Sequence, residues 1–379
     1  MSKAIRAKKR RTSFDELLMA GISAIADKGI DHVSVSDVAK LSEVSRPTFY
    51  TYFGDMPGFF AEIWLRHGME WLGNQTNAAV TMDEDFNQAM LEIFAIARRT
   101  PEVQEVVQPD VEKWWAAIKS EGESTALRMV WLLGFKLGYQ LTHKVTPQAK
   151  LGLPALQMIN FPDDVLELPI MKDLGEMKLD AVPNMPGLSL GSETVDEALT
   201  RSALEVVASS GVAATSMTRI ARKARVSTGS VYPRFKSAES LIEKSFEVAI
   251  AEIVAKNVEV VTTQGMGADQ YAFSVNAGFG PERTTWRNYR TEMHLEAAHN
   301  PGLAKFMEPG LEVTASFLEE NFKNYGATPA IARAVAWFMH SHAIGTSLIF
   351  NQVPEVGTQD NRIMTRWVIS QLPRSEEHT

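Results

Sequence analysis

The chain has 379 residues, of which 45% are hydrophobic and 22% are charged, enough for two or three globular domains. It has no cysteine, which excludes disulfides and thiolate metal sites, and its net charge of −8, taken alone, argues against a nucleic-acid-binding protein. Its apolar runs are too short to span a bilayer, and no apolar segment follows the basic N-terminus as in a secretory signal. We therefore expect a cytoplasmic protein with no membrane-spanning segment.

Three helices are predicted after the basic N-terminal segment. Apolar residues at helical spacing predict a helix that begins near Phe14 and ends at Gly29, a residue suited to a C-terminal cap. Ser34 and Ser45 are suited to the N-caps of two short helices, the second covering residues 46–52. Two short helices joined by a tight turn and packed on a longer one form a helix-turn-helix unit, whose last helix enters the major groove of DNA.

The same unit occurs again 182 positions later. Residues 17–60 align with residues 199–242 without a gap and share nine identical residues, and most other apolar positions match in kind. A repeat of this length is a whole small domain used twice, and the unbroken register argues against two unrelated helical hairpins. The identical pairs are Leu17/Leu199, Ala26/Ala208, Gly29/Gly211, Ser34/Ser216, Ala39/Ala221, Val44/Val226, Ser45/Ser227, Tyr50/Tyr232 and Phe53/Phe235.

Both copies contain the motif Val-Ser-x-x-x-x-Tyr-x-x-Phe, at residues 44–53 and 226–235. With the preceding glycine and serine-capped helix, this motif resembles the N-terminal DNA-binding domain of TetR-type transcriptional regulators. The resemblance implies an all-α fold of two TetR-like units, each with a helical effector and dimerisation domain after its helix-turn-helix domain. Conventional members are homodimers, so two units in one chain imply an intramolecular pseudo-dimer that binds a double-stranded DNA operator. A homodimer of such tandem chains is the alternative.

The two predicted recognition helices carry different residues. Arg46 is suited to bidentate pairing with guanine, and Thr48 offers a methyl group to thymine. Thr228, Gly229 and Ser230 occupy the equivalent places in the second copy. The resemblance implies that Tyr50 and Tyr232 bind phosphate. It also implies a further phosphate contact two residues later, at Tyr52 and Arg234. The expected DNA contacts are Arg10, Arg11, Ser45, Arg46, Thr48, Tyr50, Tyr52, Ser227, Thr228, Gly229, Ser230, Tyr232, Arg234 and Lys236.

Two departures from the family pattern concern these helices. The family often has a phosphate-binding lysine three residues after the phenylalanine, where this chain has Met56 and Ala238. We expect Lys236 and the basic N-terminal segment to replace that contact. Pro233 removes a backbone donor, and we expect it to end the second recognition helix at Tyr232.

Positive charge gathers on the predicted DNA-binding units despite the acidic total. Residues 1–11 contain six lysines and arginines and no acid, and residues 201–236 contain seven against Glu205 alone. This distribution suits phosphate neutralisation, although solvated surface charge is the simpler explanation of any single basic run. We expect residues 3–11 to form an arm that precedes the first helix and is unstructured without DNA.

Helical segments continue after each unit, and prolines separate the two halves. The expected helices are 57–80, 85–99, 102–119 and 123–143 in the first half, and 239–262, 268–279, 283–299, 302–323, 328–351 and 359–372 in the second. The repeat continues faintly, since Glu92 and Ala97 match Glu292 and Ala297 at a shift of 200, and Trp131 matches Trp337 at 206. The expected domains are 1–60, 61–150, a Pro/Gly-containing connector at 151–192, 193–242 and 243–379.

Aromatic residues and methionine are frequent in the helical bodies, where ordinary core is the usual explanation. The family resemblance makes some of them candidates for a pocket that binds a small apolar effector of the lipid, sterol or aromatic class. The candidates are Phe94, Trp115, Trp131, Phe135, Trp286, Tyr289, Met293 and Phe338.

No cofactor, metal site or catalytic group is expected. His340 and His342 are two positions apart and His294 and His299 five apart, so neither pair shares a helix face as metal ligands would. No nucleophile elbow or phosphate-binding glycine loop is present, which argues against an enzyme. The favoured function is a ligand-responsive repressor that binds an asymmetric operator with two unlike recognition helices. The alternative is a ligand-binding or scaffold protein in which one head no longer binds DNA.

Overall fold

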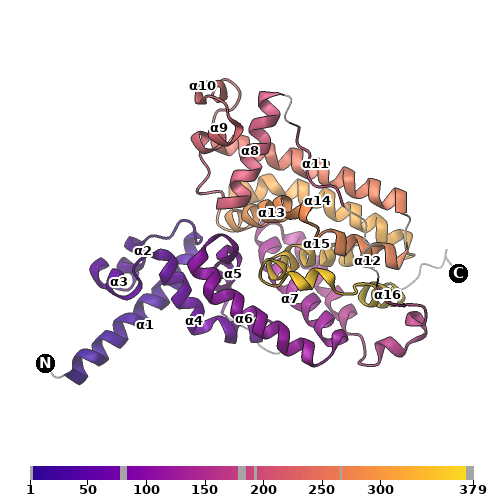
Figure 1. Cartoon of the computed structure of the whole chain (residues 1–379), viewed down its shortest axis with the longest axis horizontal. Coiled ribbons are helices and arrows are strands. Elements are labelled where there is room, and N and C mark those ends of the chain that lie inside the picture. Colours follow the sequence, from indigo (N-terminus) through magenta and orange to yellow (C-terminus); the bar gives the residue numbers. More distant parts are fainter. Residues whose placement is uncertain (1–2, 77–82, 178–184, 192–193, 265–266, 373–379) are drawn as a thin grey trace. The chain divides into compact units, whose positions relative to one another are not determined.

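The computed structural model is built of helices throughout the residues that it describes (Figure 1). These are residues 3–76, 83–177, 185–191, 194–264 and 267–372, with the backbone alone for residues 3–12 and 264. The chain divides into two compact units, residues 1–114 and residues 115–379. No helix in the described parts of the chain is long and apolar enough to cross a membrane.

The first unit contains the first helix-turn-helix domain and three body helices. Its elements are α1 (Lys3–Lys28), α2 (Val35–Leu41), α3 (Arg46–Phe53), α4 (Met56–Gln75), α5 (Glu84–Ile96), η1 (Ala97–Arg99) and most of α6 (Pro101–Ser120). Helix α1 ends where Gly29 adopts a φ of 84°, a left-handed conformation that glycine adopts without steric cost. Ser34 caps α2 in a reciprocal capping box with Asp37, and Ser45 caps α3.

The body of the first unit is filled by large aromatic side chains. Trp64, Trp71 and Phe94 are completely or almost completely buried and pack on one another, with Trp64 stacked on Phe94 at 5.7 Å between ring centroids. Trp71 Nε1 donates a hydrogen bond to Asn87 Oδ1 at 2.8 Å. Helix α1 packs on α5, and the backbone N–H of Ile30 donates to Glu92 Oε2 at 2.7 Å, which ties the head to the body.

The second unit contains the end of the first half and the whole second half. After α7 (Glu123–Val145) come η2 (Pro147–Ile159), η3 (Val165–Glu167) and η4 (Pro169–Met171). The second head follows as α8 (Val195–Ser210), α9 (Met217–Ala224) and α10 (Thr228–Val231). The second body is α11 (Ala238–Gln264), α12 (Ala268–Ala277), η6 (Pro281–Arg283), α13 (Thr284–Ala297), α14 (Pro301–Asn324), α15 (Pro329–Gln352), η7 (Pro354–Thr358) and α16 (Arg362–Ser370).

Helices α7 and α15, which are related by the internal repeat, pack on each other within the one chain. Glycines allow this close approach: a Cβ added at Gly138 would lie 1.8 Å from the carbonyl oxygen of Ser341, and one at Gly345 would lie 1.9 Å from that of Gly134. Trp131 on α7 stacks on His342 and Phe338 on α15. The tandem all-α arrangement is therefore confirmed, and α7 of the first half pairs with α15 of the second half in one polypeptide.

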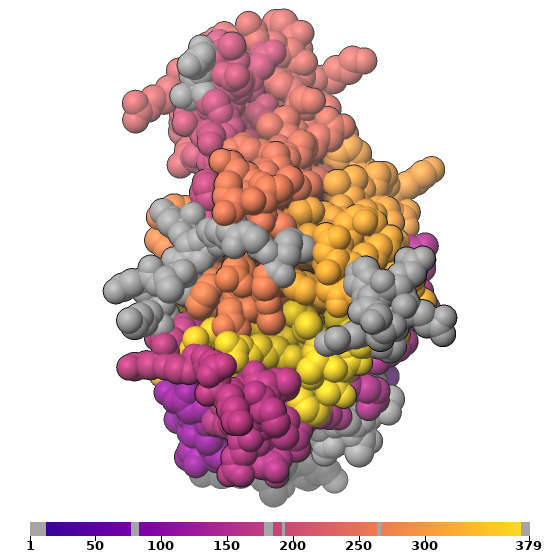
Figure 2. All heavy atoms as spheres, turned by 90° about the vertical axis from the view of Figure 1, so that its right-hand side faces the viewer, coloured from indigo at the N-terminus to yellow at the C-terminus, as the bar shows by residue number. Residues whose placement is uncertain are grey.

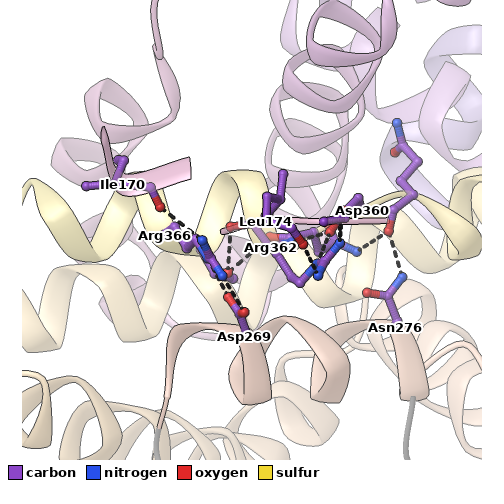
Figure 3. A network of polar contacts seen from close by, with 11 residues as sticks. Ile170, Leu174, Asp269, Asn276, Asp360, Arg362 and Arg366 are labelled. Carbon is purple, nitrogen blue, oxygen red and sulfur yellow. Dashed lines mark hydrogen bonds and ion pairs between the residues drawn. The ribbon is translucent and has the colours of Figure 1, made fainter. Parts of the chain in front are cut away.

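The connector is docked on the second half rather than free of it. Arg366 on α16 forms a bidentate ion pair with Asp269 on α12 and donates to the carbonyl oxygen of Ile170, and Arg362 donates to that of Leu174 (Figure 3). Figure 2 shows the segment around η2 to η4, in magenta, lying against α16, in yellow. Further on, Glu252 of α11 accepts the backbone N–H groups of Ser189 and Leu190.

The expected helices are found with ends shifted by a few residues, except that residues 77–80 of the helix expected at 57–80 lie outside the described residues. One expectation is wrong. Helix α1 begins at Lys3, so residues 3–11 extend the first helix and do not form an arm that precedes it. A run of lysine, arginine and alanine is compatible with a helix because these residues have high helix propensity even without apolar residues that pack. The domain boundaries given above remain a prediction.

Candidate DNA interface and ligand cavity

The buried face of the first recognition helix, α3, packs on a cluster of aromatic side chains. Phe49 is completely buried and lies 5.1 Å from Phe53 and 5.0 Å from Phe59 between ring centroids. This anchoring leaves Arg46 and Tyr50 exposed, Tyr50 by 53%. Tyr52 is partly buried against the edge of Phe14.

Each recognition helix begins with a pair of hydroxyl groups in contact, and the pair in the second head repeats that in the first. Ser45 Oγ lies 2.8 Å from Thr48 Oγ1, and Ser227 Oγ lies 2.8 Å from Ser230 Oγ. Both serines also accept the backbone N–H three residues later, as N-caps do. The pairing fixes the rotamers of Thr48 and Ser230, two of the residues expected at base edges.

The second recognition helix is shorter than the first. Helix α10 ends at Val231, and Tyr232 is its C-cap, so the predicted stop before Pro233 is confirmed. Val231 is completely buried and holds the helix, while Tyr232 is 62% exposed and Thr228, Gly229 and Lys236 are exposed. A Cβ added at Gly229 would make an ordinary contact with Ser227 Oγ at 3.8 Å, and this exposed glycine leaves its backbone uncovered at the surface.

Arg234 is placed differently from the expected phosphate contact. Its Nε forms an ion pair with Asp196 at 2.7 Å, and its Nη1 donates to the carbonyl oxygen of Ser230. The arginine therefore braces α10 against the start of α8, although its side chain is still 39% exposed. The side chains of Arg10 and Arg11 lie outside the described residues.

Three exposed arginines close to α10 in sequence are not among the expected DNA contacts. Arg219 and Arg222 lie on α9, Arg225 is its C-cap, and all three are exposed. Their density in residues 201–236 was the available signal. Phosphate contacts from the helix that precedes the recognition helix are a general feature of helix-turn-helix proteins.

Comparison with known proteins identifies both heads. The model of the family of bacterial regulatory proteins of the tetR type matches residues 17–63 and again residues 199–244. Both heads of the chain are therefore TetR-type DNA-binding domains, present in tandem.

A curated relative supports the assignment. An uncharacterized HTH-type transcriptional regulator, YvdT of Bacillus subtilis (strain 168), is 32% identical over 76 residues, or 19% of this chain. The aligned part is 37% of the length of that relative. The likeness to this regulator is thus that of one region, whereas the family model matches both heads.

The body of the second TetR-type unit encloses a cavity of about 190 Å³. Its walls are mainly apolar and come from α11, α12, α13, α14 and α15, with Met185 of the connector. None of the described residues that line it is acidic. They are Met185, Phe246, Ile250, Ile253, Asn257, Val261, Tyr271, Ser274, Val275, Gly278, Phe279, Arg283, Trp286, Arg287, Arg290, Leu311, Thr314, Phe317, Leu318, Asn321, Met339, His340, His342, Ala343 and Ser347.

The structure does not gather the eight expected ligand-binding residues into one site. Trp286 lines the cavity. Tyr289 and Met293, also on α13, are completely buried in the core shared with α8 and α11. Trp131, Phe135 and Phe338 belong to the α7–α15 core, Phe94 lies in the body of the first unit, and Trp115 donates from its Nε1 to Glu355 at 2.8 Å.

Three arginines of the cavity wall were missed by the sequence analysis. Arg283, Arg287 and Arg290 are spaced by four and three residues, so they share one face at the start of α13. That spacing on an otherwise apolar helix was the available signal. Arg283 and Arg287 are each only 3% exposed.

Three of the four histidines considered as metal ligands, His294, His340 and His342, are buried. Burial lowers the pKa of His294 to about 4 and that of His342 to about 3. His294 Nδ1 is paired with the carbonyl oxygen of Arg290, and His342 Nε2 lies 3.0 Å from Thr346 Oγ1. No group of three or more metal-binding side chains occurs among the residues whose placement is known.

Proposed function

We propose that this chain is a ligand-responsive transcriptional repressor in which one polypeptide binds an asymmetric operator through two unlike heads. The observation that carries the proposal is the packing of α7 on α15, because it pairs the two halves inside one chain. A homodimer presents two identical recognition helices, whereas this chain carries Arg46 and Thr48 in one and Thr228, Gly229 and Ser230 in the other.

The two heads differ in their means of recognition. Arg46 supplies a bidentate donor for a guanine, and the second head offers hydroxyl groups and bare backbone. Tyr50 and Tyr232 are exposed at equivalent positions and suit phosphate contacts that fix the register of each head. Lys236 and the basic start of α1 add sequence-independent attraction to the DNA backbone.

The cavity supports ligand responsiveness because one helix borders both it and the head. Helix α13 lines the cavity with Trp286 and packs on α8, the first helix of the second head. On the side of α11, Tyr289 OH lies 2.8 Å from Ser245 Oγ and donates to the carbonyl oxygen of Ile242 at 3.1 Å. A ligand that moves α13 would therefore move α8 and α11 together, and with them the placement of α10.

Selection of binding sites from random duplex DNA tests the proposal. We expect a consensus of two dissimilar half-sites, with centres one helical turn apart. A palindromic consensus would contradict the unlike heads. Enrichment of a single half-site would favour the alternative in which one head no longer binds DNA. Repression is tested by placing the selected site in a promoter that drives a reporter gene.

A further inference from the structure

The cavity of the second body combines apolar walls with buried arginines, Arg283, Arg287 and Arg290, that form no ion pair with an acidic side chain among the described residues. Arg287 donates to the carbonyl oxygens of Gly278 and Gly280 and to Thr284 Oγ1. Arg283 donates to Asn257 Oδ1, and Arg290 donates to the carbonyl oxygen of Ala343 and to Ser347 Oγ. All of these acceptors are neutral, so the hydrogen bonds orient the guanidinium groups without balancing their charge.

Each of the three arginines also keeps one buried donor unused. Their Nε atoms are buried and have no hydrogen-bond partner, and neither has Nε2 of His340, which lines the same cavity and is 4% exposed. A buried polar group without a hydrogen-bond partner is destabilising, and an unpaired buried charge is more so. The three guanidinium Nε–H groups are donors that a ligand in the cavity would satisfy, and Nε2 of His340 is a fourth buried polar atom beside them.

The electrostatics of the site favour an anion. Burial lowers the pKa of Arg283 and of Arg287 to about 10, and burial with repulsion from the other two arginines lowers that of Arg290 to about 9. All three therefore stay protonated at neutral pH. Glu252 is the acid whose charge acts on Arg283, but its carboxylate is already bound to Lys256 and to two backbone N–H groups.

The first half of the chain does not repeat this arrangement. At the shift of 200 that aligns α5 with α13, the arginines correspond to Asp83, Asn87 and Met90. Asp83 caps α5, and Asn87 accepts hydrogen bonds from Trp71 and Gln75. The charged cavity is thus a property of the second body.

We propose that this cavity binds an organic carboxylate with an apolar body, its carboxylate held by Arg283, Arg287 and Arg290 and its chain lying among the apolar side chains of α11 and α14. A planar carboxylate matches the paired N–H donors of guanidinium groups, and the buried Nε atoms gain the partner that they lack. The identity of the effector as an acid rests on the proposed function. The binding itself does not.

Calorimetry on the purified full chain with matched ligands tests the proposal without any variant. We expect decanoate to bind with one molecule per chain, and 1-decanol and decanamide to bind about tenfold to a hundredfold more weakly, because a charge-assisted hydrogen bond contributes about 1.5–3 kcal/mol. Acetate, which lacks the apolar chain, should not bind measurably. A parallel titration with 4-phenylbutyrate shows whether the cavity prefers aliphatic or aromatic acids. Neutral ligands that bind as tightly as decanoate would overturn the proposal.

Substitution identifies the binding groups. Arg290→Gln should weaken decanoate binding at least tenfold and leave decanol binding unchanged, and Arg287→Lys, which keeps the charge but not the planar donors, should show an intermediate loss. Arg66→Gln, which removes a half-exposed arginine on α4, is the matched control and should bind decanoate as the parent chain does. Unchanged decanoate binding by Arg290→Gln would overturn the proposal.

The outcomes separate this proposal from the proposed function. Binding of decanoate that leaves affinity for the selected DNA unaltered would support the carboxylate site and count against ligand-responsive regulation by it. Release of DNA by a neutral ligand, with no binding of decanoate, would support regulation and overturn the carboxylate site.

Discussion

At the scale of single residues, the two heads share their support and differ in what they expose. The distance between the two hydroxyl oxygens is the same in Ser45–Thr48 and in Ser227–Ser230. Phe49 and Val231 are both completely buried. Such features were predictable from the sequence because capping and burial follow from local residue type. The ion pair of Arg234 with Asp196 was not predictable, because it joins residues of two helices whose side-chain directions only the fold determines.

Replacing Arg46 should affect one half-site. We expect Arg46→Ala to relax base preference in the half-site read by α3 and to weaken binding by about 1–3 kcal/mol, since a bidentate arginine–guanine pair is lost. Thr228→Ala, the equivalent change in the second head, should alter the other half-site alone. Competition binding with a panel of single-base operator variants measures both effects, and equal effects of Arg46→Ala on the two half-sites would contradict the assignment.

Asp37 should make the first head sensitive to acid. Hydrogen bonds from Lys28 and Ser34 hold the pKa of this carboxyl below its ordinary value of 3.8. A lowered pKa means that the stabilisation is complete above about pH 4 and is lost as the pH falls below it. We expect Asp37→Asn to lower the first thermal transition at pH 7, with a difference from the parent chain that shrinks toward pH 3. Asp15→Asn, at an exposed position of α1, should change little at either pH.

At the scale of elements, periodicity and capping predicted most helices, and their packing required the structure. The prediction placed a helix over 328–351 and α15 covers Pro329–Gln352, because a long amphipathic pattern is an unambiguous signal. The cavity lining was mostly missed. Composition alone does not distinguish a core tryptophan such as Trp64 from one that lines the cavity, such as Trp286. Which arginines line the cavity depends on which face of their helix borders it.

The α7–α15 crossing should be intolerant of side chains at its glycines. A Cβ at Gly138 would meet backbone, which does not move as a side-chain tip does. We expect Gly138→Val to lower the free energy of unfolding by about 3 kcal/mol or more, the upper range for overpacked cores. At Gly73 on α4 an added Cβ meets nothing, so Gly73→Ala should stabilise the chain by about 0.5–1 kcal/mol. Urea denaturation measures both, and a neutral Gly138→Val would show that the crossing is loose.

At the scale of the whole molecule, α13 lines the cavity and packs on α8, so we expect the proposed ligand response to act on the second head. Tyr289→Phe removes the hydroxyl that bonds to Ser245 and Ile242 while leaving the buried ring in place. We expect this variant to bind decanoate as the parent chain does but to lose much of the effect of decanoate on DNA affinity. Titration of DNA binding with and without the ligand measures the coupling factor, which linkage requires to be the same in both directions. An unchanged coupling factor would show that the hydrogen bonds of Tyr289 do not transmit the effect of the ligand to the DNA-binding head.

Tandem duplication should also make operator binding independent of dilution. A homodimeric regulator dissociates at low concentration and then loses its second head, whereas heads joined in one polypeptide stay at a high effective concentration for each other. We expect one chain per operator, with a binding isotherm of Hill coefficient near one from micromolar to picomolar protein. Mass photometry of the chain on a labelled duplex counts the chains directly. If two chains occupied each operator and the isotherm were sigmoidal, the pairing of heads would occur between molecules. The α7–α15 contact would then hold the body together without providing the second half of the DNA-binding surface.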